Sequence, residues 1–140
     1  MSTSLIKQVA LYWFYMLVIA FTNGTIRQLV VTPVVGDAVA HIIACVVGCT
    51  AFFFLIRRFV RRNLSQLTVQ RSWMVGAVWL IVTVIFEFGM GLSTGRSWEF
   101  MLHDYNLLAG RFWIFILATE LVMPVFFYQR FSKRNAGQSK

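Results

Sequence analysis

Glu87 lies inside a long apolar segment of this 140-residue chain, where an ionisable side chain is unfavourable unless it has a partner. Arg27 ends the first apolar segment and Arg111 begins the last, so both arginines can reach the depth of Glu87. Two arginines facing one glutamate would leave a positive pocket for a phosphate, a carboxylate or an anionic lipid headgroup. Further polar residues expected in this binding site are Asn23, His41, Tyr105 and Asn106.

The same charges also fit a structural role. An ion pair of Glu87 with one arginine would fix the register of two helices, and the other arginine would extend to the headgroups. The residue types alone leave both interpretations open.

Glu120 lies near the middle of the last apolar segment, with Pro124 one turn later. We expect no basic residue at its depth, because Arg111 falls on the opposite side of the same helix. An isolated carboxylate is costly in hydrocarbon, so Glu120 is expected to hold a proton. It could carry a proton or receive a cation. Alternatively, it is a neutral group hydrogen-bonded to a neighbouring helix or subunit.

A second set of candidates follows a four-residue spacing in the second apolar segment: Asp37, His41, Cys45 and Cys49. Imidazole and thiolate bind zinc or copper, so His41, Cys45 and Cys49 are weak candidates for a metal site. A straight stripe along one helix cannot converge on one ion without ligands from other helices. A parallel row of small residues favours close helix packing instead: Gly36, Ala40, Ala44 and Gly48. We therefore expect no metal and no cofactor.

The elements that position these residues are four apolar segments in a chain that is 59% hydrophobic and 13% charged. Each has about 20 residues, enough to cross a hydrocarbon core of about 30 Å. No long period-two alternation indicates a barrel, and a soluble bundle would need polar faces that these segments lack. The predicted fold is one all-α domain over residues 1–140, a polytopic membrane protein with two helical hairpins. The expected helices are residues 8–27, 34–56, 73–92 and 107–128.

The connections carry most of the charge. Ten of the thirteen basic residues lie before the first helix, in the loop 57–72, or in the polar tail 129–140. By the positive-inside rule, both termini and this loop are predicted to be cytoplasmic. Anionic headgroups explain the basic residues, so no nucleic-acid partner is expected. In the second outer connection, Ser97 is expected to cap a short interfacial helix that carries Trp98 and Tyr105.

Enzyme motifs are absent: the chain has no Gly-x-Ser-x-Gly, His-Glu-x-x-His or phosphate-binding loop. Residues 23–41 contain the patterns NGxxR, PxxG and AH, and residues 87–113 contain EF, SW and DYNxxxGRxW. With these patterns the chain resembles a family of small bacterial membrane proteins of unassigned function. The resemblance implies a bacterial inner membrane. Small multidrug exporters share the length and helix number, but they carry an essential glutamate in the first helix, which has none here.

The sequence thus predicts a small inner-membrane protein that binds or transports a small anion or lipid headgroup. Two alternatives remain, namely an accessory subunit of a larger membrane complex and an intramembrane enzyme. Membrane lipids are the expected partners, together with a homo-oligomer or a larger complex.

Overall fold

A computed structural model describes residues 2–95, 97–99 and 113–138 of the chain. The described residues form helices and no strand, which confirms the all-α fold. Four helical spans are long and apolar enough to cross a membrane, so the protein is a multi-pass membrane protein. The elements are α1 (Thr3–Ile26), a π-helical turn η1 (Arg27–Val31), α2 (Thr32–Val35), α3 (Asp37–Arg62), a 3-10 turn η2 (Leu64–Gln66), α4 (Val69–Ser93) and α6 (Ile114–Gln138).

The first helix is longer than the predicted 8–27, because α1, η1 and α2 form one span from Thr3 to Val35. Pro33 does not end it. A proline has no N–H and its ring presses on the carbonyl group four residues earlier, here that of Leu29. The π-helical turn just before Pro33 widens the helix at this point, so the chain stays helical. The chain then reverses at Gly36, which has a φ of 80°. Residues with a Cβ rarely adopt this backbone conformation.

The second helix also continues past its predicted end, so the basic connection is shorter than 57–72. Arg57, Arg58, Arg61 and Arg62 belong to α3, and Arg71 belongs to α4. Long arginine side chains reach polar surroundings while the helix continues, and positive charge favours a helix C-terminus. Thr68 caps α4 by accepting a hydrogen bond from the N–H of Arg71 at 3.2 Å. Residues 129–138 of the expected polar tail are helical as well.

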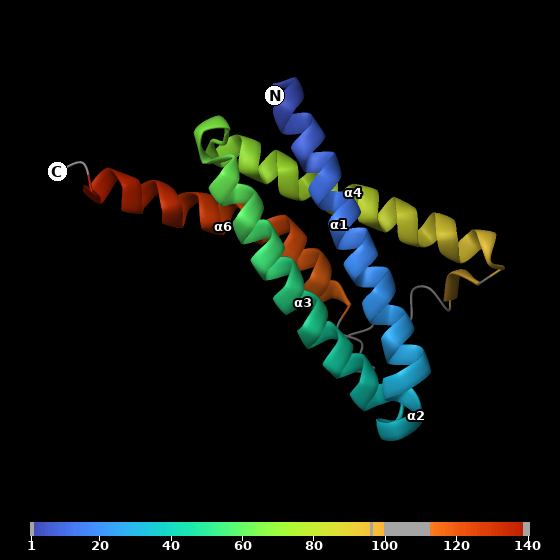
Figure 1. Ribbon diagram of the computed structural model, residues 1–140. Coiled ribbons are helices and arrows are strands. Elements are labelled where there is room, and N and C mark those ends of the chain that lie inside the picture. The colour runs from blue at the N-terminus through green and yellow to red at the C-terminus, as the bar shows by residue number, and fades with distance from the viewer. Residues whose placement is uncertain (1, 96, 100–112, 139–140) are drawn as a thin grey trace.

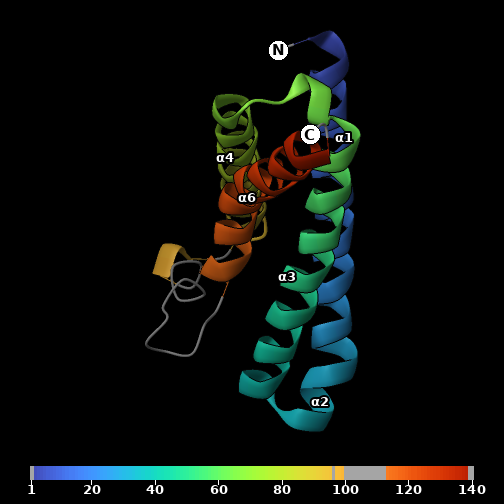
Figure 2. The same cartoon turned by 90° about the vertical axis from the view of Figure 1, so that its left-hand side faces the viewer.

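Aromatic side chains hold three helices together near the N-terminus. Tyr12 of α1 and Trp79 of α4 both pack edge-to-face on Phe59 of α3, with ring centroids 5.2 and 5.0 Å apart. The indole N–H of Trp79 also donates to the carbonyl oxygen of Val9 at 2.9 Å. From this cluster α1 and α3 run side by side, whereas α4 diverges from α1 (Figures 1 and 2).

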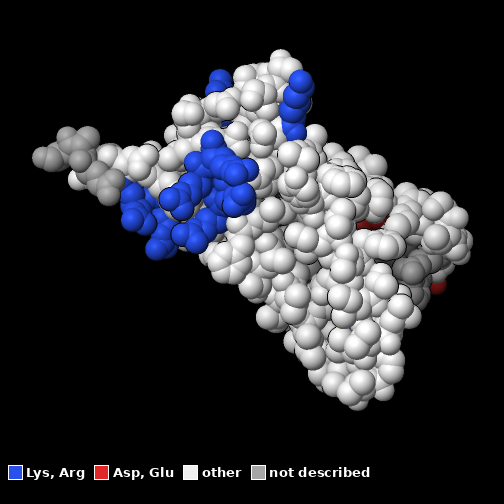
Figure 3. Space-filling view, viewed as in Figure 1, with Lys and Arg blue, Asp and Glu red and all other residues white. Residues whose placement is uncertain are grey.

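The charges separate the two ends of the molecule. On the face shown in Figure 3, Lys and Arg gather around the adjoining ends of α3 and α6 and near the start of α1. We call this the basic end, and we call the end that contains Gly36 and Ser93 the far end. Of the expected interfacial helix the structure describes only Ser97 to Glu99, where the Trp98 ring lies 5.5 Å from that of Phe88. The rest of that helix lies outside the described residues.

Candidate functional site

A cavity of about 240 Å³ occupies the space between α1 and α4, with α6 forming part of its wall. It begins where Trp13 bridges the two helices and extends toward the far end. Its aromatic wall residues are Trp13, Phe21, Phe52, Phe86 and Trp113. Its polar ones are Thr25, Gln28, Thr83, Glu87 and Glu120. The cavity therefore contains both glutamates that the sequence places inside apolar segments.

Glu120 forms the most buried polar part of this wall, with 1% of its surface exposed. Its Oε1 accepts a hydrogen bond from the Thr83 hydroxyl group at 3.2 Å. Thr83 in turn accepts one from the indole N–H of Trp13 at 3.1 Å. Three helices thus meet in a chain of two hydrogen bonds that ends on the carboxyl group. The hydrogen bond to a neighbouring helix expected for Glu120 is present, and its proton-carrying role stays a prediction.

Glu87 lies one turn beyond Thr83 on the same face of α4, and its Oε2 accepts the indole N–H of Trp113 at 2.9 Å. Trp113 comes just before α6 begins. The two carboxyl groups reach similar depth because Glu87 precedes the end of α4 by six residues and Glu120 follows the start of α6 by six.

This arrangement suits an amphipathic ligand with a polar group that complements a carboxyl group. Aromatic side chains provide most of the apolar contact area of such sites, and a few polar groups orient the ligand. Trp and Phe rings also attract cations over their faces. None of the described residues that line the cavity is a lysine or an arginine.

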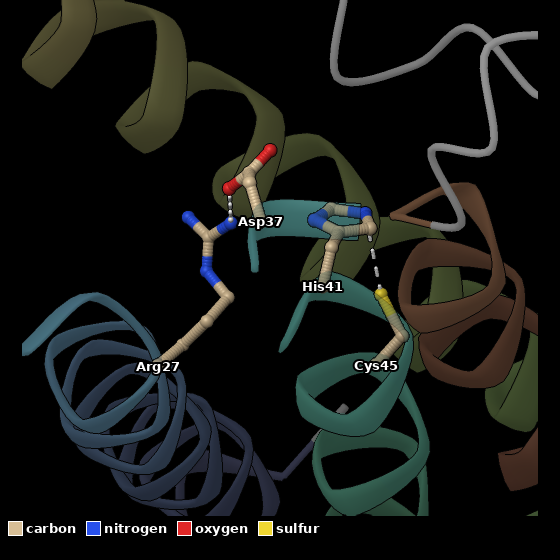
Figure 4. A network of polar contacts seen from close by, with 4 residues as sticks. All are labelled: Arg27, Asp37, His41 and Cys45. Carbon is tan, nitrogen blue, oxygen red and sulfur yellow. Dashed lines mark hydrogen bonds and ion pairs between the residues drawn. The ribbon is translucent and has the colours of Figure 1, made fainter. Parts of the chain in front are cut away.

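Arg27, a predicted partner of Glu87, forms its ion pair with Asp37 instead (Figure 4). Arg27 Nη1 lies 3.5 Å from Asp37 Oδ1, with side chains 20% and 53% exposed. The pair spans the sharp turn at Gly36, so Asp37 reaches Arg27 more easily than a residue of another hairpin does. A half-exposed pair contributes little stability, but it compensates the arginine charge.

His41 and Cys45 lie one helical turn apart on α3 and face the same side (Figure 4). Both are buried, and the Cys45 Sγ lies 3.6 Å from His41 Nε2. Cys49, one turn further, is half-buried. Within residues 2–95, 97–99 and 113–138, no three His, Cys, Asp or Glu side chains come together as a metal site.

Asn23, another predicted ligand residue, connects two helices. Its Nδ2 donates to the carbonyl oxygen of Ala44 at 2.7 Å. A Cβ added to Gly48 would lie 3.3 Å from the same Nδ2 and 3.2 Å from Cδ1 of Ile116. These contacts give Ala44 and Gly48, two members of the predicted small-residue row, a role in close packing of α3 on α1 and α6.

Three predicted site residues, Tyr105, Asn106 and Arg111, lie outside the described residues. In the described part of the chain, sequence reasoning missed Thr83, Trp13 and Trp113. The four-residue spacing of Thr83 and Glu87 and the seven-residue spacing of Trp113 and Glu120 would have indicated two shared helix faces. No spacing indicates that these two faces turn toward each other.

Comparison with known protein families, curated proteins and solved structures finds no match to this chain.

Proposed function

We propose that this multi-pass membrane protein binds a small amphipathic molecule in the cavity between α1 and α4. The observation that carries the proposal is the position of two carboxyl groups and five aromatic rings in one cavity at membrane depth. Polar groups inside a membrane are costly and usually mark a ligand or ion site. The hydrogen bonds to Thr83 and Trp113 hold these carboxyl groups at the wall without filling the cavity.

Access from the membrane supports an amphipathic ligand. Phe21 on α1 and Met90 on α4, both in the wall, are 65% and 43% exposed. They lie at membrane depth, so the open side of the cavity faces lipid. A molecule that partitions into the bilayer can enter there without crossing the basic end.

The anion-binding hypothesis gains no support from the described residues, because Arg27 is compensated by Asp37 and the cavity carries acidic groups. That hypothesis now depends on Arg111. The accessory-subunit, oligomer and enzyme alternatives stay predictions.

The bacterial inner-membrane location rests on the sequence resemblance, and the basic end supports a cytoplasmic position for both termini. In the described chain this end carries basic residues from all four long helices: Lys7, Arg57, Arg58, Arg61, Arg62, Arg71, Arg130, Lys133 and Arg134. Positive residues concentrate on cytoplasmic sides, where anionic headgroups attract them.

The test is binding of a neutral aromatic alcohol, 1-naphthalenemethanol, to protein in zwitterionic nanodiscs by equilibrium dialysis, with empty nanodiscs subtracted. Gly24 lines the cavity, and a Cβ built there has nothing within 4 Å. Gly24→Leu therefore adds a bulky apolar side chain to the cavity wall at a position with space for its Cβ. We expect it to weaken binding about tenfold or more, the loss expected when a bulky side chain displaces part of an apolar ligand.

Gly89→Leu is the matched control. Gly89 also lies in a membrane helix with open space around its Cβ position, but it is not in the cavity wall. Binding to this variant should equal that of the wild type. Equal binding to all three proteins, or binding to none, would contradict the proposal.

A further inference from the structure

We infer that the preferred ligand of this cavity is an organic cation, an amphipathic ammonium ion whose charge is received by Glu120. The inference rests on the proposed function, since it names the class of molecule that the cavity would bind. It comes from the hydrogen bonding and charge of the wall.

The carboxyl group of Glu120 has unused hydrogen-bonding capacity. Its Oε2 is fully buried and accepts no hydrogen bond from the described residues, whereas Oε1 accepts one from Thr83. Buried carboxyl oxygens nearly always have partners, so an unpartnered one in a cavity wall indicates a position for a donor that the described residues do not supply.

The hydrogen-bond donors of Thr83, Trp13 and Trp113 are directed to other acceptors. The single hydroxyl hydrogen of Thr83 is directed to Oε1, and the indole N–H of Trp13 is directed to Thr83. The indole N–H of Trp113 is directed to Glu87. The donors of these three wall residues are therefore engaged with other acceptors, and an N–H of a bound ligand can take the position beside Oε2.

The charge of the wall selects the sign of the ligand. The described wall contains two carboxyl groups and no basic side chain. Binding of an ammonium ion favours the ionised form of Glu120, with which it forms a charge-assisted hydrogen bond, whereas an anion finds no cationic side chain among these residues. Each ion in such a pair offsets the cost of the other in a low-dielectric environment.

Two indole rings add to the preference for a cation. Trp13 and Trp113 lie in the wall, and their hydrogen bonds to Thr83 and Glu87 fix the orientation of the rings. Tryptophan is the strongest aromatic partner for ammonium groups. Because Glu120 is 1% exposed, its carboxyl group must turn toward the ligand on binding, and this movement strains its hydrogen bond with Thr83.

The test compares three ligands of one shape at pH 7.5: 1-naphthylmethylamine, 1-naphthalenemethanol and 1-naphthoic acid. In the wild type, the amine should bind about tenfold or more tightly than the alcohol, and the acid more weakly than the alcohol. In Glu120→Gln, the amine and the alcohol should bind within about twofold of each other. Glu99→Gln, which changes an exposed glutamate outside the cavity wall, should keep the wild-type preference.

The outcomes separate the two proposals. Suppose that the alcohol binds and that Gly24→Leu weakens its binding. If the amine then binds the wild type no more tightly than the alcohol does, or still binds Glu120→Gln more tightly than the alcohol does, the cavity binds ligands but this inference is wrong. If the preference instead disappears only in Glu87→Gln, the assignment to Glu120 is wrong. If none of the three ligands binds, both proposals fail.

A measurement on the wild type guards against a variant that does not fold. Dicyclohexylcarbodiimide modifies carboxyl groups inside membranes, and mass spectrometry of the digested protein locates the modification. The amine should protect Glu120 at about one-tenth of the concentration that the alcohol requires. Equal protection by the two ligands would overturn the inference.

Discussion

The hydrogen bond from Asn23 Nδ2 to the Ala44 carbonyl oxygen joins α1 to α3 at a length of 2.7 Å. A helix carbonyl group is already an acceptor within its own helix, so this second bond uses its remaining lone pair. In a membrane the amide of Asn23 would otherwise lack a partner. Its role is therefore to fix the two helices relative to each other.

Asn23→Ala should lower the free energy of unfolding by about 1 kcal/mol, the usual range for a hydrogen bond between membrane helices. Asn23 is not in the cavity wall, so ligand binding should stay unchanged. Unfolding in mixed micelles measures the stability. Thr50→Ala serves as the control, since the Thr50 hydroxyl group bonds only within α3 and is exposed. A loss of ligand binding with unchanged stability would instead show that Asn23 contacts the ligand.

At the scale of the elements, α4 crosses α6 beside the site. A Cβ added to Gly76 would clash with the carbonyl oxygen of Leu121 and would lie 2.9 Å from that of Glu120. Pro124 lies inside α6 and has no N–H to offer the carbonyl group of Glu120, four residues earlier. The proline thus frees a carbonyl group at the place where Gly76 lets α4 approach. This close crossing positions Glu120 against α4.

Gly76→Ala should destabilise the protein by about 2–3 kcal/mol, because backbone atoms rather than flexible side chains would have to move. The same displacement should weaken ligand binding. Gly89→Ala has space for the added methyl group and should change stability by less than about 1 kcal/mol. Unfolding in mixed micelles compares the two variants. Equal free energies of unfolding for Gly76→Ala and Gly89→Ala would contradict the close approach of α4 to α6 at Gly76.

At the scale of the whole molecule, we propose that the four candidate spans leave both termini on the cytoplasmic side of the membrane, together with the basic end. A test replaces Cys45 and Cys49 by alanine and introduces one cysteine, at exposed Val34 or exposed Asn135. A membrane-impermeant maleimide should label Val34→Cys in cells with a permeabilised outer membrane and an intact inner membrane. It should label Asn135→Cys only after the inner membrane is opened. The reverse pattern would refute the proposed orientation.

Much of the fold could be predicted from the sequence, because about 20 consecutive apolar residues have few structures other than a spanning helix. The helix ends were less predictable. Pro33 and the arginines from Arg57 to Arg62 usually indicate a helix end or a loop. Here a π-helical turn accommodates the proline, and the arginine side chains reach the surface from within α3.

The candidate site was predicted in part. Glu87 and Glu120 were identified one by one, because a carboxyl group in an apolar segment is conspicuous. Their meeting in one cavity depends on how α4 and α6 rotate about their axes, which packing decides. The ion pair of Asp37 with Arg27 became visible only with the tight turn at Gly36.

The first span, Thr3–Val35, has 33 residues and is therefore about 50 Å long, well beyond a hydrocarbon core of about 30 Å. It must incline steeply or extend into the headgroups. The 25 residues of α4 exceed the core by much less. A change in bilayer thickness therefore tilts α1 more than α4, and hydrophobic mismatch alters the angle between them. The width of the cavity opening thus depends on the acyl-chain length of the surrounding lipids.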